Sequence, residues 1–334
     1  MLRFGIVGFG LHAVKRMMPA FTASEKCTVT ALARRDAVKA AGSARQFNIP
    51  HAFTSVEELC RHPEVDAVFV TSPNFLHLAD VLTAVAAGKP VLCEKPMGMN
   101  AGECKQMVEA ARKANVVLGV AHVFRFEDGT ARFREQLAAD MVGRPVFARS
   151  EFCFQAGKEH PRKWIKDRSM AGAGPLFDIG VHCIDTLRYI LQDEVTRVSA
   201  RAVMDRPPST VELSCAMVME FARGTLASVL VSYTAEYRTP LEIVAQRGVM
   251  RAEDALTVEH PISIEVRRPG APVETETVSN HLAYIRQVDA FADAVERGSP
   301  FPCSGEDGWQ NQEILDSALR SMQSGRTEDV PQVR

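Results

Sequence analysis

The first 120 residues alternate between short apolar runs and longer amphipathic segments, and this alternation restricts the fold more than any other feature of the chain. Strands that alternate with helices of about 10–15 residues predict βαβ units, with a parallel sheet covered by helices on both faces. Strands buried on both faces read as continuous apolar runs, as these do. The predicted strands are 2–7, 28–33, 66–71, 90–93 and 116–120, and the predicted helices are 11–21, 37–47, 75–87 and 101–114.

The pattern changes near residue 122. Strand-like runs then follow one another with few helical segments between them, and such short connections predict a mostly antiparallel sheet. A length of 334 residues also favours two domains. We predict an α/β domain over residues 1–122, with a parallel sheet and helices on both faces, and an α+β domain over 123–334 with a large, open, mostly antiparallel sheet. The predicted strands here are 198–204, 211–221, 225–233, 241–245 and 262–267, and the predicted helices are 133–141, 176–191, 281–297 and 307–324.

Charge and cysteine content exclude several classes of function. Lys and Arg number 39 and Asp and Glu 41, so the net charge is −2 and no overall field favours nucleic acid or an anionic membrane. No apolar run approaches the roughly 20 residues that cross a bilayer, and the N-terminus has no export-signal pattern. The eight cysteines form no CxxC pair, and no spacing indicates a metal site. We expect a cytoplasmic protein with reduced thiols, no metal and a small-molecule substrate.

Gly8-Phe9-Gly10-Leu11-His12-Ala13 lies between the first predicted strand and the first predicted helix. This is the GxGxxA form of the dinucleotide-binding motif. Its first glycine permits a tight turn, its second lets the backbone approach a pyrophosphate, and its small last residue lets helix and strand pack. The alternative is a glycine-rich turn of another α/β protein. We expect cofactor contacts from Gly8, Phe9, Gly10, Leu11 and His12.

The end of the second predicted strand indicates which dinucleotide is bound. In an NAD site an Asp or Glu at this point accepts hydrogen bonds from the ribose 2′-hydroxyl. Arg34 occupies that position and Arg35 follows it. Because a guanidinium can bind a 2′-phosphate bidentately, we predict NADP(H) in preference to NAD(H). In the alternative, both arginines are solvated and Asp36 is the ribose acid.

Three further segments carry a resemblance to a known family. Thr71-Ser72-Pro73-Asn74, with His77, follows the third predicted strand, and Glu94-Lys95-Pro96 follows the fourth. Segment 172–182 contains the pattern DxGxH after Gly172-Ala173-Gly174. The set resembles the glucose-fructose oxidoreductase / inositol dehydrogenase / rhizopine-catabolism (Gfo/Idh/MocA) family of sugar dehydrogenases over nearly the whole chain. Ala173 is a slight departure, since the family usually has a third glycine there.

The resemblance implies that Lys95 is catalytic, because the family lysine of this segment lies in the active site and its bond to the following proline is commonly cis. The residues alone place Lys95 directly after a buried parallel strand, at the sheet edge where α/β proteins bind ligands. Without the resemblance it would be read as a surface lysine. His77 could equally be an ordinary residue of a helix face. The further cofactor contacts that the resemblance implies are Ser72, Pro73, Asn74, His77, Glu94 and Lys95.

Asp178 and His182 lie four residues apart in a predicted helix, and therefore on one face. A carboxylate one turn away can hold a histidine in one tautomer and suit it to proton transfer near pH 7. We expect His182 to be the general base in oxidation and the general acid in reduction, and Lys95 to stabilise alkoxide charge. Asp178 would orient His182 or the substrate, and Asp185 would be structural. Which of Lys95 and His182 transfers the proton stays open.

Three residues are weaker predictions for substrate contacts. His122 and Arg125 follow the fifth predicted strand at the expected domain junction, where the family lines its cleft. Trp164 is one of two tryptophans. Arg125 could instead pair with an acid, and Trp164 could be a packing residue.

The combined expectation is an NAD(P)-dependent oxidoreductase that transfers a hydride between nicotinamide and a sugar, polyol or keto-sugar. Two alternatives remain: a nicotinamide-dependent glycoside hydrolase of the same family, and a non-catalytic cofactor-sensing regulator. The apolar runs 211–219 and 226–231 favour a homodimer or homotetramer formed through the C-terminal sheet. The resemblance implies the same, because members of the family commonly dimerise or tetramerise in this way.

Overall fold

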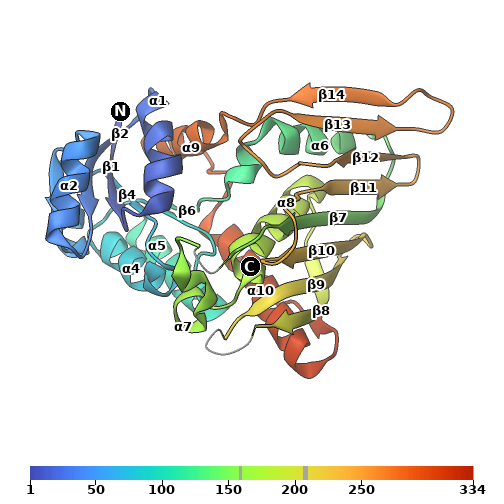
Figure 1. The fold of residues 1–334 in the computed structure, drawn as a ribbon. Helices are drawn as coiled ribbons and strands as arrows, with labels where there is room; N and C mark the ends of the chain where they lie inside the picture. Colours follow the sequence, from blue (N-terminus) through green and yellow to red (C-terminus); the bar gives the residue numbers. More distant parts are fainter. Residues whose placement is uncertain (158–159, 206–209, 334) are drawn as a thin grey trace. The chain divides into compact units, whose positions relative to one another are not determined.

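The computed structural model describes residues 1–157, 160–205 and 210–333 (Figure 1). The chain forms two compact units. The first comprises Met1–Ala121 and Tyr284–Trp309, and the second comprises His122–Ala283 and Gln310–Arg334. One unit is built on a parallel sheet and the other on a mostly antiparallel sheet, which confirms the predicted fold class. The first unit thus also contains a late segment that lies outside the predicted range 1–122.

The six strands of the first sheet run in the order β3-β2-β1-β4-β5-β6, and every neighbouring pair is parallel. The strand order reverses at β1, which has β2 on one side and β4 on the other. Open α/β sheets bind ligands at the carboxyl ends of the strands at such a reversal. The strands are β1 (Leu2–Val7), β2 (Cys27–Ala33), β3 (His51–Phe53), β4 (Ala67–Val70), β5 (Val91–Cys93) and β6 (Leu118–Val120).

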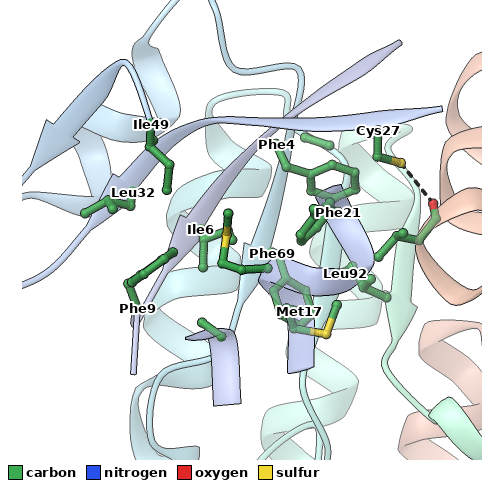
Figure 2. Packing of buried hydrophobic residues seen from close by; sticks show 14 of the residues in the cluster. Phe4, Ile6, Phe9, Met17, Phe21, Cys27, Leu32, Ile49, Phe69 and Leu92 are labelled. Carbon is green, nitrogen blue, oxygen red and sulfur yellow. Dashed lines mark hydrogen bonds between the residues drawn. The ribbon is translucent and has the colours of Figure 1, made fainter. Parts of the chain in front are cut away.

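Aromatic side chains form the centre of the core on one face of this sheet (Figure 2). Phe4 and Phe69 of the strands pack with Met17 and Phe21 of the helical stretch 13–23, and the rings of Phe4 and Phe21 lie 5.0 Å apart. Phe291, from the late segment, lies 5.8 Å from Phe4. Burying one such side chain contributes about 1.5–3 kcal/mol, which explains why the chain returns here after residue 283.

Side-chain caps mark where several helices of the first unit begin. Asp36, Ser55 and Asn100 each accept a hydrogen bond from the backbone N–H three residues later, which satisfies a donor that the helix itself cannot. β3 and α3 were not predicted, because they are only three and six residues long. The helical segments are η1 (Ala13–Met17), α1 (Met18–Ala23), α2 (Ala37–Phe47), α3 (Val56–Arg61), η2 (Asn74–Leu76), α4 (His77–Ala86), α5 (Ala101–Ala114) and α9 (Ala283–Arg297).

The second sheet has nine strands in the order β14-β13-β12-β11-β7-β10-β9-β8-β15. Its neighbouring pairs are antiparallel except β7 with β10. β7, at the centre, was not predicted, because charged residues, exposed Arg149 and buried Glu151, interrupt its apolar residues. The strands are β7 (Pro145–Cys153), β8 (Val195–Met204), β9 (Glu212–Phe221), β10 (Leu226–Ser232), β11 (Leu241–Ala245), β12 (Gly248–Ala252), β13 (Ile262–Arg267), β14 (Glu274–Val278) and β15 (Glu328–Asp329).

Helix α8 is buried along nearly its whole length and packs against β7 and α6 of the second unit. Among the described residues, no helix is long and apolar enough to span a membrane. The helical segments are η3 (Val123–Phe126), α6 (Asp128–Ala138), η4 (Lys163–Lys166), α7 (Arg168–Ala171), η5 (Leu176–Gly180), α8 (Val181–Leu191) and α10 (Gly305–Ser324), of which α10 begins in the first unit.

Candidate active site

The fingerprint glycines form the turn that leaves β1. Gly8 has a φ of +81°, in the left-handed region that favours glycine, and a Cβ at this position would lie 2.5 Å from the backbone nitrogen of Ser72. A Cβ on Gly10 would meet the Gly8 carbonyl oxygen at 3.7 Å, an ordinary contact distance. The turn therefore lies at the carboxyl ends of β1 and β4, and its exposed backbone at Gly10 fits the pyrophosphate of a dinucleotide.

The side chains around these glycines differ in environment. Phe9 is buried and packs edge-on against Phe47, with ring centroids 5.5 Å apart, so its backbone is the part that remains for a cofactor. Leu11 is exposed. His12 Nε2 lies 2.9 Å from Oε1 of Glu94, at the end of β5.

Glu94 connects the fingerprint to the segment that carries Lys95. Burial opposes ionisation of Glu94, but the imidazole of His12 and the ammonium of Lys95 lower its pKa below the ordinary value. The backbone N–H of Lys95 donates to Glu94 Oε2 at 3.2 Å. The Lys95–Pro96 peptide bond is cis.

His77 joins the loops that follow β4 and β5. Its two ring nitrogens lie 2.8 Å from the Ser72 carbonyl oxygen and 3.0 Å from the Pro96 carbonyl oxygen, and the side chain is buried. The Ser72 hydroxyl donates to the buried carboxylate of Asp80 at 2.6 Å. Asn74 is also buried, and Pro73 precedes it in the same loop. Through these contacts His77 links the two loops.

The arginines after β2 differ in their surroundings. Arg34 is half-buried, and its Nη1 donates to the hydroxyl of Ser43 in α2 at 2.8 Å, whereas Arg35 is exposed. The Asp36 carboxylate caps α2 by accepting the Lys39 N–H at 3.0 Å, and it also lies 3.3 Å from Lys39 Nζ. Asp36 thus already has a structural role.

In the second unit, Glu212 of β9 holds the start of the helix that carries Asp178 and His182. Its carboxylate accepts the N–H of Gly174 with both oxygens and the N–H of Leu176 with one, all at 3.0 Å. A Cβ on Gly174 would lie 2.2 Å from the Glu212 carbonyl oxygen, so this approach requires glycine. Burial raises the pKa of Glu212, although these N–H groups oppose the rise.

Asp178 lies in the π-helical turn η5, and His182 lies in the first turn of α8. Arg162 binds the Asp178 carboxylate with both terminal nitrogens, at 2.9 and 3.0 Å, and the Tyr233 hydroxyl donates to it at 3.1 Å. The ring of His182 lies against Phe124, with centroids 4.6 Å apart, and 6.0 Å from that of Phe152. The imidazole is therefore held by aromatic rings.

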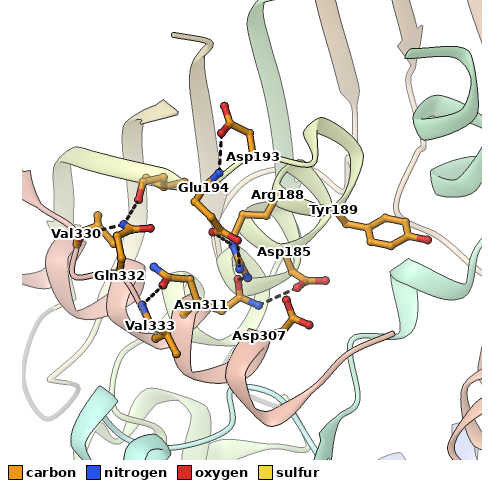
Figure 3. Close-up of polar contacts among 12 residues, drawn as sticks. Asp185, Arg188, Tyr189, Asp193, Glu194, Asp307, Asn311, Val330, Gln332 and Val333 are labelled. Carbon is orange, nitrogen blue, oxygen red and sulfur yellow. Dashed lines mark hydrogen bonds and ion pairs between the residues drawn. The ribbon is translucent and has the colours of Figure 1, made fainter. Parts of the chain in front are cut away.

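Asp185, one turn after His182, anchors a buried polar network (Figure 3). Arg125 donates to both of its oxygens at 2.6 to 3.1 Å, and Asn311 donates to Oδ1 at 2.8 Å. Burial alone would raise the pKa of Asp185, but Arg125 and His122 hold it below its ordinary value. Arg188 donates to Asn311 at 2.7 Å, so the network ties α8 to α10.

The structure distributes the predicted residues over the two units. Lys95 and the dinucleotide turn belong to the first, whereas Asp178, His182 and the three weaker substrate predictions belong to the second. Arg125 pairs with Asp185, His122 Nε2 lies 3.0 Å from Asn311 Nδ2, and Trp164 lies in η4.

Sequence reasoning missed three residues that contact this site: Arg162, Tyr233 and Glu212. An acid at the start of an otherwise apolar strand was a usable signal for Glu212. No local pattern indicated the other two. Nor did spacing indicate that His51, His62 and Glu64 lie with their ligand atoms within 4.8 Å of one another, with His51 Nε2 2.5 Å from Glu64 Oε2.

Comparison with known proteins identifies both halves of the chain. Residues 2–122 match the oxidoreductase family with an NAD-binding Rossmann fold, and residues 130–251 match the GFO/IDH/MocA C-terminal domain. A 1,5-anhydro-D-fructose reductase of Ensifer adhaerens is 32% identical over 92% of each chain. A D-xylose 1-dehydrogenase (NADP(+)) of Haloferax volcanii is 31% identical over 97% of this chain and 98% of its own.

A solved structure agrees with these matches. The aldose-aldose oxidoreductase of Caulobacter crescentus superposes with a TM-score of 0.91 at 25% identity, covering 98% of this chain and 99% of its own. The dinucleotide turn, the strand order and the matches over both halves lead to one conclusion: the chain belongs to the Gfo/Idh/MocA family of NAD(P)-dependent oxidoreductases.

Proposed function

We propose that this protein interconverts a CH–OH group and a carbonyl on a sugar, polyol or keto-sugar, with NADP(H) as the favoured cofactor. The observation that carries the proposal is the site on η5 and α8, where Asp178 is ion-paired and His182 lies one turn further along, beside the rings of Phe124 and Phe152. The names of the relatives, a sugar-derived ketone reductase and a sugar dehydrogenase, support the substrate class.

Within this proposal the cofactor supplies the hydride acceptor or donor, and the chain positions the substrate and handles the proton. Gly8, Gly10 and the loops after β4 and β5 would hold the dinucleotide. His182 accepts the hydroxyl proton in oxidation and returns it in reduction. Lys95 stabilises the negative charge that develops on the same oxygen. A screen of sugars, inositols and keto-sugars with both cofactors, read by nicotinamide absorbance, tests the activity. Glycoside cleavage without net cofactor turnover would contradict the proposal.

The preference for NADP(H) rests on Arg34. Its guanidinium is oriented by Ser43 beside the end of β2, while the nearby acid, Asp36, already caps α2 and pairs with Lys39. A relative named for NADP(+) supports the preference. Arg34→Asp should weaken NADP(H) binding by at least about tenfold relative to NAD(H), because it replaces a bidentate donor by a repelling charge. Unchanged relative affinities would contradict this assignment.

Self-association through the second sheet is the other part of the proposal. Phe147, Val218, Leu226 and Leu230 are exposed on one face of neighbouring strands, with Phe147 and Leu226 in register and 52% and 42% exposed. An exposed cluster of apolar side chains on a sheet face favours association with a second copy of the chain. We expect light scattering to detect a homodimer or homotetramer. We expect the Phe147→Glu variant to be dissociated. A monomer at micromolar concentration would contradict it.

A further inference from the structure

Asp178 is held from two sides by residues to which nothing above assigns a role in the reaction. Arg162 precedes η4, and its Nη1 and Nη2 donate to Asp178 Oδ1 and Oδ2 at 2.9 and 3.0 Å. Tyr233 follows β10, and its hydroxyl donates to Oδ2 at 3.1 Å. We propose that Arg162 and Tyr233 are positioning residues that keep Asp178 an oriented carboxylate, so that Asp178 directs its neighbours and does not accept the proton. This inference rests on the proposed function.

The geometry of the Arg162 contact is that of a strong, directional pair. Two parallel N–H···O bonds fix both the distance and the plane of the carboxylate, which a lysine ammonium cannot do. The side chain of Asp178 is 10% exposed and that of Arg162 is 33% exposed, so water screens the pair only in part. The pair therefore opposes protonation of Asp178 and fixes the direction of its oxygens.

Tyr233 adds a second donor that keeps its proton. The side chain is 2% exposed, and its ring lies edge-on against Phe154 with centroids 5.2 Å apart. Burial, and next the charge of Asp178, raise the pKa of Tyr233 well above its ordinary value. Its hydroxyl therefore stays protonated over the working pH range and serves as a donor to the carboxylate.

Other charged groups lie on the elements that carry or neighbour η5, and some of them already have partners. His160 and Lys166 lie on the segment that carries Arg162, and burial, then Arg162, lowers the pKa of His160. Glu212, from β9, holds the backbone of the η5 turn. From β7, Glu151 pairs with Arg149 and Arg238, and His182 lies one turn along α8.

Removing the guanidinium should move protonation of Asp178 to higher pH, because a cation at this distance favours the ionised form. The effect is visible in the reduction direction. In that direction His182 must be protonated, so loss of its proton limits the rate at alkaline pH. Protonation of Asp178 then limits the rate at acid pH. Arg162→Gln should lose activity at acid pH and recover it as pH rises, and Arg162→Lys should shift less. Tyr233→Phe removes a hydrogen bond but no charge, so its shift should be smaller still.

The matched control is Lys163→Gln, which removes one positive charge from an exposed neighbour in the same segment. It should leave the acid limb of kcat/KM where it is in the parent protein. An acid limb unchanged in Arg162→Gln, or a loss of activity equal at all pH values, would overturn the inference and indicate a merely structural pair.

A measurement that does not need turnover separates this inference from the proposed function. Carboxyl carbon NMR of protein labelled at aspartate, with the Asp178 signal assigned through Asp178→Asn, follows protonation directly. Asp178 should titrate at higher pH in Arg162→Gln and in Arg162→Lys than in the parent protein. If this shift occurs in a protein that is inactive on every substrate, the proposed function is refuted, but the positioning role of Arg162 and Tyr233 is supported. If Asp178 titrates at the same pH in all three proteins, the positioning role is refuted, whatever the activity.

Discussion

The buried pair of Arg125 and Asp185 leads to a quantitative prediction about stability. Asp185 is 1% exposed and Arg125 is 8% exposed, and three hydrogen bonds join them. Arg125→Met keeps an unbranched apolar side chain of similar length but leaves a buried carboxylate without its cation. Breaking such a pair from one side costs about 3–5 kcal/mol. Asn311 and His122 remain beside Asp185, so we expect the lower end, about 3 kcal/mol at pH 7.

The cost should depend on pH with a definite sign. In the parent protein the pKa of Asp185 is held below its ordinary value, so its charge, and the stability it brings, is retained at pH 5 and pH 7. In Arg125→Met burial dominates and raises that pKa. A group whose pKa is raised on folding loses stability as pH rises, so the variant should be less destabilised at pH 5 than at pH 7.

Urea unfolding followed by circular dichroism at both pH values measures this. With a slope of about 2 kcal/mol per M, the expected loss lowers the midpoint by about 1.5 M at pH 7. Arg132→Met, which breaks an exposed pair with Glu276, is the control and should change the midpoint far less. The double variant Arg125→Met, Asp185→Asn should regain part of the loss. A midpoint shift equal to that of the control, or identical at pH 5 and pH 7, would refute the reasoning.

Three further predictions concern the site. Gly8→Ala should abolish dinucleotide binding in calorimetry while the second unit stays folded, because its Cβ would lie 2.5 Å from Ser72 N at a φ of +81°; normal affinity would contradict the turn described here. Gly174→Ala should lower the thermal midpoint and kcat together, since its Cβ would lie 2.2 Å from the Glu212 carbonyl oxygen, and a parent-like midpoint would show that the strand can yield. His182→Ala should reduce kcat by about 10²–10⁴-fold with KM nearly unchanged, as expected for a lost proton-transfer group, and full turnover would remove it from the mechanism.

Local patterns were sufficient for some elements of both units. The apolar run of β1 and the GxGxxA motif after it predicted both a strand and its ligand-binding turn, and the strand found covers the same residues. The segment 176–191 was recognised as helical from its period, and the structure builds it from η5 and α8. Such signals are readable because the residues that interact lie within one turn or one strand of each other.

Longer-range pairings were not readable in this way. β7 carries charged residues among its apolar ones, so its central place in the sheet became evident only from its neighbours β10 and β11. The return of residues 284–309 to the first unit depends on Phe291 meeting Phe4, which lie far apart in the chain.

The sequence by itself determined the fold class and the glycine turn after β1, because each depends on neighbours in the chain. The reacting groups that we propose were assigned from motifs that resemble those of a family. Only the tertiary structure decided which partner each ionisable group has. It paired Asp178 with Arg162, 16 residues away, and Asp185 with Arg125, 60 residues away. A charge is stabilised by whatever surrounds it in space, and at such separations the path of the whole chain selects those surroundings.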